Sequence, residues 1–168
     1  SGGNYSVVNS IGYIGGYQFG MALLEDLGYV VSGSWARYKK NKFLTVKEIW
    51  TGKGGCKSQD DFLANKGVQD AAFQEEMKLL WGRGKKGGLV SADTPAAKLA
   101  GMLATGHLLG TGGMRDLLRG RAKADAYGTS ASEYYKLGYN AVKAGTPIYP
   151  TEATINKDDE PIVAVEGA

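Results

Sequence analysis

The chain has 168 residues, which suits a single domain with a substantial core, and its 20 basic and 17 acidic residues give a net charge of only +3. So small a charge argues against a nucleic-acid partner. The lone cysteine, Cys56, excludes an intrachain disulfide. One cysteine and one histidine in the whole sequence are too few for a zinc-binding cluster, so we expect neither a metal nor a cofactor. No apolar run reaches the length of a membrane span, and no Gly-x-Ser-x-Gly motif supports acyl transfer.

The charge is unevenly distributed along the chain. Residues 145–168 contain five acidic side chains and one lysine, a net charge of −4, so residues 1–144 carry +7. A basic body fits an anionic polymer as partner, although a solvated surface is the plainer interpretation. Three of the four prolines also lie beyond Gly145. We therefore expect residues 145–168 to form a separate extended tail, either a linker or a strip that docks on a partner.

The first twenty residues are rich in glycine and polar side chains. Six of them are glycine, which permits close backbone approach and positive φ, and the Asn, Ser, Tyr and Gln residues between them could bind a polyhydroxylated ligand. A tight connection whose glycines only solve a packing problem is the alternative. An apolar run at 21–27, ended by Gly28, predicts a helix directly afterwards.

Three spaced groups in this stretch carry a family resemblance: residues 1–5 (Ser-Gly-Gly-Asn-Tyr), 9–12 (Asn-Ser-Ile-Gly) and 15–19 (Gly-Gly-Tyr-Gln-Phe). The pattern resembles the start of a lytic transglycosylase domain, in the lysozyme-like family that includes goose-type lysozymes and phage-type muramidases. That family opens with a Glu-Ser pair followed by a Gly-Leu-Met-Gln-like tetrapeptide, to which residues 15–18 are similar. The resemblance implies a mainly α, lysozyme-like helical domain over residues 1–144.

The resemblance also implies site residues. The family's catalytic acid would be a glutamate immediately before Ser1, so the catalytic residue is expected outside this sequence. Residues 104–115 are similar to the glycine-rich end of a third motif of the family, with His107 at the position of its tyrosine. The alternative is that His107 has only a structural role, with its hydrogen bonds met within the helical fold. The substrate-binding residues so implied are Ser1, Gly16, Tyr17, Gln18, His107 and Tyr134, with Tyr135 as the alternate for the last.

Further along the chain, periodicity and capping patterns predict four more helices. Ser58 can cap a short helix, and apolar residues spaced three to four apart predict a longer one over 68–81, with Glu75 and Glu76 on its solvated side. Residues 82–88 are expected to form a basic, flexible loop. Thr94 or Asp93 as N-cap begins the next helix, and a capping box at 130–133 begins the last, which ends at Gly145.

The stretch between residues 30 and 50 mixes aromatic and basic residues. Aromatic faces stack on sugar rings and cations attract acidic groups, so the stretch could bind a sugar chain. A half-buried aromatic cluster in irregular structure explains the same composition, and periodicity does not separate the two interpretations. We expect a small β element or irregular structure at about 29–50.

The resemblance favours cleavage of the β-1,4 bond between MurNAc and GlcNAc in peptidoglycan, by a lytic transglycosylase or a muramidase. Peptidoglycan is then the partner, and the site of action is extracellular or periplasmic. The resemblance to phage-type members also implies that residues 145–168 could dock on a virion or secretion-apparatus protein. Because no signal peptide is recognisable, we expect delivery by a removed leader, a carrier protein or a phage particle. The alternative is a non-catalytic peptidoglycan-binding or structural tail domain that lacks the acid.

Overall fold

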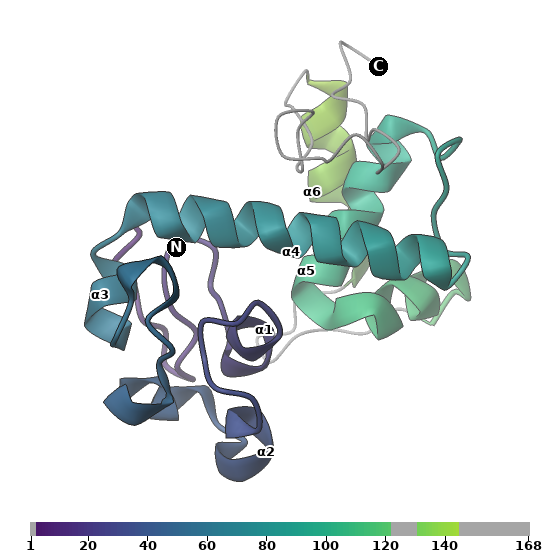
Figure 1. Cartoon of the computed structure of the whole chain (residues 1–168). Helices are drawn as coiled ribbons and strands as arrows, with labels where there is room; N and C mark the ends of the chain where they lie inside the picture. The colour runs from purple at the N-terminus through teal and green to yellow at the C-terminus, as the bar shows by residue number, and fades with distance from the viewer. Residues whose placement is uncertain (1–2, 122–130, 145–168) are drawn as a thin grey trace. The chain divides into compact units, whose positions relative to one another are not determined.

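The computed structural model describes residues 3–121 and 131–144, except for the side chains of Ala131 and Tyr134. These residues are mainly helical, as predicted, and among them no β-strand forms beyond isolated bridges (Figure 1). Contacts divide the chain into two compact units, residues 1–75 (unit 1) and 76–168 (unit 2). The predicted tail at 145–168 lies outside the described residues, so its boundary at residue 144 stays a prediction.

Unit 1 consists of short helices joined by tight turns. They are α1 (Met21–Asp26), α2 (Ser34–Tyr38), three 3-10 helices (Asn41–Thr45, Lys47–Ile49 and Lys53–Gly55), α3 (Gln59–Leu63) and the first part of α4 (Lys66–Lys86). The stretch at 29–50 is therefore irregular, with a single antiparallel bridge between Val30 and Trp50. The Ser58 hydroxyl caps α3 by accepting from the Asp61 amide at 3.1 Å, as the sequence predicts.

The core of unit 1 is aromatic and is centred on Phe62. This side chain is fully buried, and the rings of Phe19, Tyr29 and Trp50 lie 5.5–5.7 Å from its own. The Trp50 indole donates to the Leu44 carbonyl oxygen at 2.8 Å, so the largest of these rings is buried without an unmet polar group. Residues from four separate segments thus meet at one ring.

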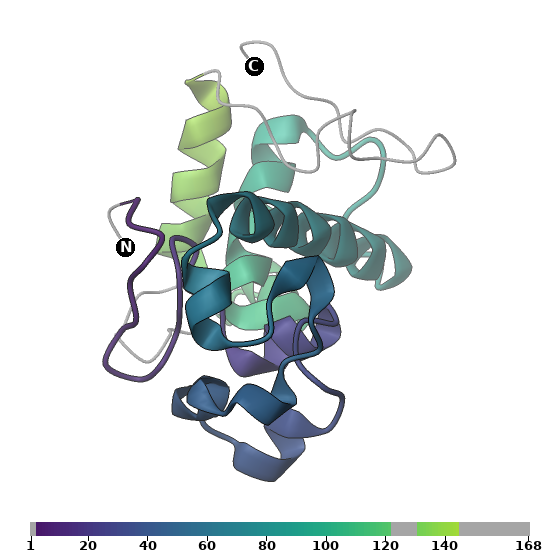
Figure 2. The ribbon, with the colours of Figure 1, turned by 60° about the vertical axis from the view of Figure 1, so that its left-hand side comes forward.

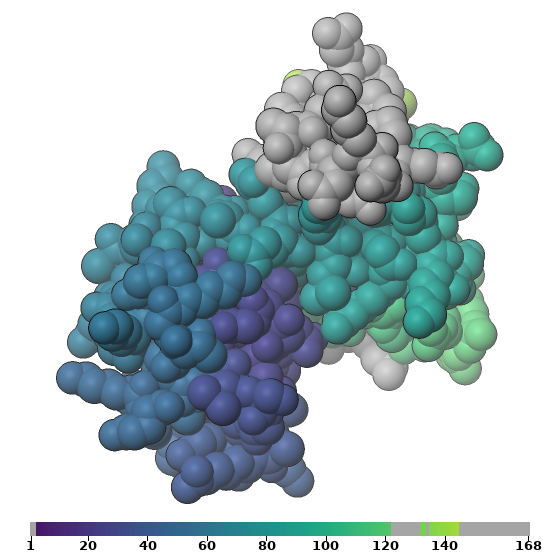
Figure 3. Space-filling model, in the orientation of Figure 1, coloured from purple at the N-terminus to yellow at the C-terminus, as the bar shows by residue number. Residues whose placement is uncertain are grey.

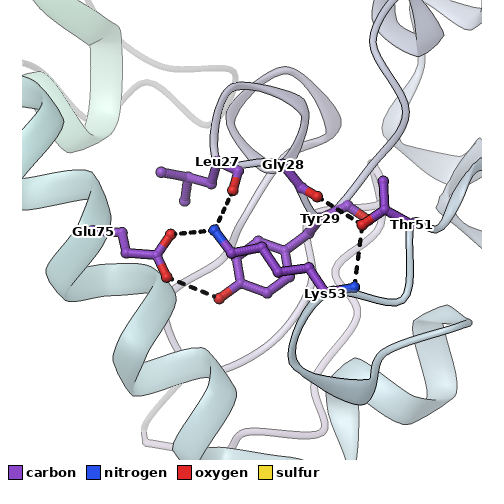
Figure 4. Close-up of polar contacts among 6 residues, drawn as sticks. All are labelled: Leu27, Gly28, Tyr29, Thr51, Lys53 and Glu75. Carbon is purple, nitrogen blue, oxygen red and sulfur yellow. Dashed lines mark hydrogen bonds and ion pairs between the residues drawn. The ribbon is translucent and has the colours of Figure 1, made fainter.

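A lysine joins the end of α1 to α4 within unit 1 (Figure 4). The Lys53 ammonium donates to the Leu27 carbonyl oxygen at 2.5 Å and to Glu75 Oε2 at 2.6 Å, and the Tyr29 hydroxyl donates to Glu75 Oε1 at 3.3 Å. Burial, with a contribution from the Glu75 charge, raises the pKa of Tyr29 well above its ordinary value. Glu75, predicted to be solvated, is instead half-buried and holds these groups together.

Unit 2 contains the rest of α4, α5 (Ala96–Leu118) and α6 (Ala131–Lys143), with α6 packed along α5 (Figures 1 and 2). Glycines make this close approach possible. A Cβ on Gly138 would lie 2.3 Å from the Ala100 carbonyl oxygen, and one on Gly101 would lie 2.6 Å from the ring of Tyr135. Tyr135 therefore faces α5, and burial raises the pKa of its hydroxyl.

Two sequence expectations about helix limits need correction. Residues 82–86 continue α4 rather than forming a loop, and their glycines are tolerated inside a helix whose preceding turns are anchored by buried Met77, Leu80 and Trp81. The helix predicted from Thr94 begins at Ala96, because the Thr94 hydroxyl accepts from the Ser91 amide at 2.9 Å instead of capping the helix.

In the described part of the chain, no helix is both long and apolar enough to cross a membrane.

Candidate functional site

The segment that carries the resemblance folds into a compact loop in unit 1. The backbone amides of Ile14 and Phe19 donate to each other's carbonyl oxygens at 3.0 and 2.8 Å, so residues 15–18 form its tip. Both side chains are fully buried and anchor the ends of the tip in the core. Gly15 has φ +79° and Gln18 has φ +57°, which reverses the chain direction within four residues. We call residues 12–20 the glycine loop.

The buried side chain of Gln69 holds the glycine loop against α4. Its Oε1 accepts from the Gly16 amide at 2.9 Å, and its Nε2 donates to the carbonyl oxygens of Tyr5 and Phe62 at 2.9 and 3.0 Å. A Cβ on Gly15 would lie 2.3 Å from Gln69 Oε1, so glycine is required there by space as well as by φ. The backbone of the loop tip is therefore held by one amide side chain together with the bond from the Gly15 amide to the Val7 carbonyl oxygen at 2.7 Å.

Tyr17, a predicted substrate-binding residue, is fixed just as firmly. Its ring stacks on Phe73 with centroids 4.4 Å apart, and its hydroxyl donates to Asp70 Oδ1 at 2.7 Å. The Tyr5 hydroxyl donates to the same oxygen at 2.6 Å. Burial, together with the hydrogen bonds to Tyr5 and Asp70, raises the pKa of Tyr17 far above its ordinary value. Tyr17 therefore stays protonated and can position groups but cannot act as a base.

Gln18 lies beside Tyr17 and is half-buried. Its side-chain amide donates to the Gly15 carbonyl oxygen at 3.0 Å, which orients the group across the loop tip. Among the described residues nothing donates to its Oε1. A ligand hydroxyl or amide N–H could therefore be accepted there.

Unit 2 contains a histidine–carboxylate pair. His107 Nδ1 lies 2.7–2.8 Å from both oxygens of Glu76, whose side chain is only 2% exposed, while that of His107 is 19% exposed. The prediction that Glu76 is solvated was wrong, because the carboxylate points into the helical core and finds a partner on α5. In the tautomer that has a proton on Nδ1, His107 donates to this carboxylate.

The predicted site residues fall into two groups. Gly16, Tyr17 and Gln18 lie together at the tip of the glycine loop in unit 1, and His107 lies on α5 in unit 2. Ser1 and the side chain of Tyr134 lie outside the described residues. His107 as a groove residue stays a prediction; its pairing with Glu76 equally suits a histidine satisfied within its helical unit.

Sequence reasoning did not identify Gln69, Asp70 or Glu76 as site residues. All three lie on α4, and Gln69 and Glu76 are almost completely buried. The sequence signal that could have identified such residues is a polar residue on an otherwise apolar helix face, since a buried polar group requires hydrogen-bond partners. In α4 this signal is weak, because charged and polar residues occur on every side of the helix.

In the part of the chain that the structure describes, no group of three or more His, Cys, Asp or Glu side chains is arranged to hold a metal ion. Cys56 is buried, and burial raises the pKa of its thiol, which opposes thiolate chemistry. No protein-family model, curated protein or solved structure matches the chain.

Proposed function

We propose that this chain is the greater part of a lysozyme-like domain that cleaves the MurNAc–GlcNAc β-1,4 bond of peptidoglycan, as a lytic transglycosylase or a muramidase. The observation that carries the proposal is the fixed glycine loop: the residues that resemble the family's opening motif are the ones that Gln69, Asp70 and Phe73 hold against α4. Catalysis by positioned groups requires such rigidity, because small displacements of a reacting group cost large factors in rate.

The proposed chemistry needs one acid. A glutamate preceding Ser1 in the full protein would protonate the leaving oxygen, while the substrate's N-acetyl group and its C6 hydroxyl, or water, complete the displacement. Gln18 Oε1 would accept a hydrogen bond from the sugar, and the loop backbone would approach it closely. Tyr17 and Asp70 would keep the loop in position. The site of action would be extracellular or periplasmic, where peptidoglycan lies, with delivery by a phage particle or a larger protein.

The test compares three versions of the chain on purified peptidoglycan, with mass spectrometry of the soluble products. They are the chain as printed, a version with Glu ahead of Ser1, and a matched version with Gln there. Anhydro-muropeptides from the Glu version alone would support a lytic transglycosylase, and reducing-end products would support a muramidase. Wall binding without products from any version would overturn the enzyme proposal and favour a non-catalytic peptidoglycan-binding or structural tail domain.

A further inference from the structure

Residues 35–47 of unit 1 present aromatic rings and cations together at its surface. Figure 3 shows the blue atoms of this part of the chain exposed to solvent. We call this the aromatic–basic surface. It comprises three rings and five basic side chains: Trp35, Tyr38 and Phe43, with Arg37, Lys39, Lys40, Lys42 and Lys47. All five basic residues are exposed, as is Trp35, while Tyr38 and Phe43 are half-buried.

The positive charge of this surface is not neutralised within the described chain. None of its five basic side chains forms an ion pair or a hydrogen bond with a described acidic residue. Lys53, in the same unit, behaves differently, because it is paired with Glu75 at 2.6 Å. Five exposed cations over thirteen residues, with no acidic partner among the described residues, create a local field that attracts anionic ligands.

The backbone that carries the surface is anchored on both sides. The Trp35 amide donates to Glu25 Oε1 at 3.1 Å, and the Ser34 hydroxyl donates to the Val31 carbonyl oxygen at 2.7 Å. Asn41 is buried, and its Oδ1 accepts from the Met21 amide at 2.9 Å. The surface is therefore held in place before any ligand arrives, which lowers the entropic cost of binding.

The rings differ in what they offer to a ligand. Tyr38 and Phe43 stack on each other with centroids 4.8 Å apart, the Arg37 guanidinium lies 5.0 Å from the Tyr38 centroid, and the Lys42 ammonium lies 5.3 Å from that of Phe43. These two rings thus position cations. Trp35 has no ring or cation contact among the described residues and is 38% exposed. It is the ring left open for stacking.

The aromatic–basic surface adjoins the glycine loop. A Cβ on Gly12 would lie 2.5 Å from the Lys42 amide nitrogen and 2.7 Å from the Asn41 carbonyl carbon, so the start of the loop lies directly against this segment. A polymer bound along residues 35–47 would therefore pass beside the loop on the same unit.

We propose that the aromatic–basic surface docks a peptidoglycan strand through one sugar ring and its anionic peptide stems. The choice of polymer rests on the proposed function. Trp35 would stack on the apolar face of a sugar ring, and the surrounding cations would pair with stem-peptide carboxylates. A single-stranded nucleic acid would be expected to use several successive stacking platforms, whereas only one ring is open here.

The test measures co-sedimentation of the full chain as printed with purified peptidoglycan sacculi, which needs no cleavage. Trp35→Ala is expected to weaken binding about fivefold, the size of one aromatic contact, and Trp35→Phe to restore part of it. Lys39→Gln with Lys40→Gln is expected to weaken binding and flatten its salt dependence. The charge-matched control, Lys86→Gln with Lys98→Gln, changes two exposed lysines of unit 2 and is expected to leave Trp35-dependent binding intact.

Two further ligands in the same binding assay identify the chemistry that the surface recognises. Sacculi whose carboxylates have been amidated should lose the dependence on Lys39 and Lys40 but keep that on Trp35. Equal binding of oligo-dT with the same losses would overturn the peptidoglycan assignment in favour of nucleic acid. If the version with Glu ahead of Ser1 cleaves peptidoglycan but Trp35→Ala binds normally, the docking proposal fails while the enzyme proposal stands. If binding depends on Trp35 but no version cleaves, the docking proposal stands while the enzyme proposal fails.

Discussion

Gln69 and Gly16 are 53 residues apart in the sequence, yet the Gln69 side chain accepts a hydrogen bond from the Gly16 amide at 2.9 Å. Gln69 is completely buried, and its Nε2 satisfies the carbonyl oxygens of Tyr5 and Phe62 as well. One side chain of α4 thus adds a long-range contact to the antiparallel bridge that the glycine loop makes with Val8. The position of the loop is therefore a property of α4 as much as of the loop's own glycines.

Replacing Gln69 by leucine should destabilise unit 1 and release the glycine loop. The change removes the side-chain acceptor of the Gly16 amide and the donor to the Tyr5 carbonyl oxygen, while the Phe62 carbonyl oxygen keeps the Asn65 amide, and each unmet buried group costs about 1–3 kcal/mol. We expect a fall of at least about 2 kcal/mol in the free energy of unfolding by urea. Gln74→Leu is the control, since Gln74 is half-buried on the same helix and hydrogen-bonds no described residue through its side chain. Equal losses in the two variants would contradict the role assigned to Gln69.

The pair of Glu76 and His107 predicts non-additive mutations in unit 2. His107→Leu removes the described partner of a carboxylate that is 2% exposed, and breaking such a buried pair costs about 3–5 kcal/mol. Replacing both residues by leucine should cost less than His107→Leu alone, because no unpaired charge is then buried. The measurement is a double-mutant cycle on urea unfolding. Additive losses would show that the two side chains do not stabilise each other.

The sequence was sufficient for the helices whose limits depend on local signals, and insufficient for contacts made at long range. The sequence identifies Ser58 as a helix cap because the amide that it accepts from, Asp61, is only three residues away in the sequence. It identifies the helix after Gly20 from a run of apolar residues. Glu76 was misassigned because its partner lies 31 residues away. Gln69 and Asp70 reach the glycine loop over 53 residues, and no spacing rule connects them to it.

Unit 1 should lose stability in alkaline solution because two of its tyrosines hold their protons tightly. The ordinary pKa of tyrosine is 10.0, and burial raises those of Tyr17 and Tyr29. Above about pH 10 the unfolded chain releases these protons while the folded unit retains them, so their contribution to stability is complete below that pH and falls as the pH rises further. Tyr17→Phe should reduce the slope of unfolding free energy against pH between about 9.5 and 11, by about a third if Tyr17, Tyr29 and Cys56, whose thiol pKa burial also raises, contribute equally. Tyr38→Phe serves as the comparison, since the Tyr38 hydroxyl bonds no described residue.

Gly110 and Gly112 lie two residues apart in α5 and should respond to alanine in opposite directions. Gly110 has φ +70° and ψ −173°, a conformation that only glycine adopts without strain, whereas Gly112 is helical, and a Cβ on either residue would meet open space. Gly110→Ala should therefore cost about 1–3 kcal/mol through the backbone alone. Gly112→Ala should gain up to about 1 kcal/mol, because it removes conformational entropy from the unfolded chain. Thermal and urea unfolding of the two variants measures both. A stabilised Gly110→Ala variant would mean that the backbone of α5 is helical at this position.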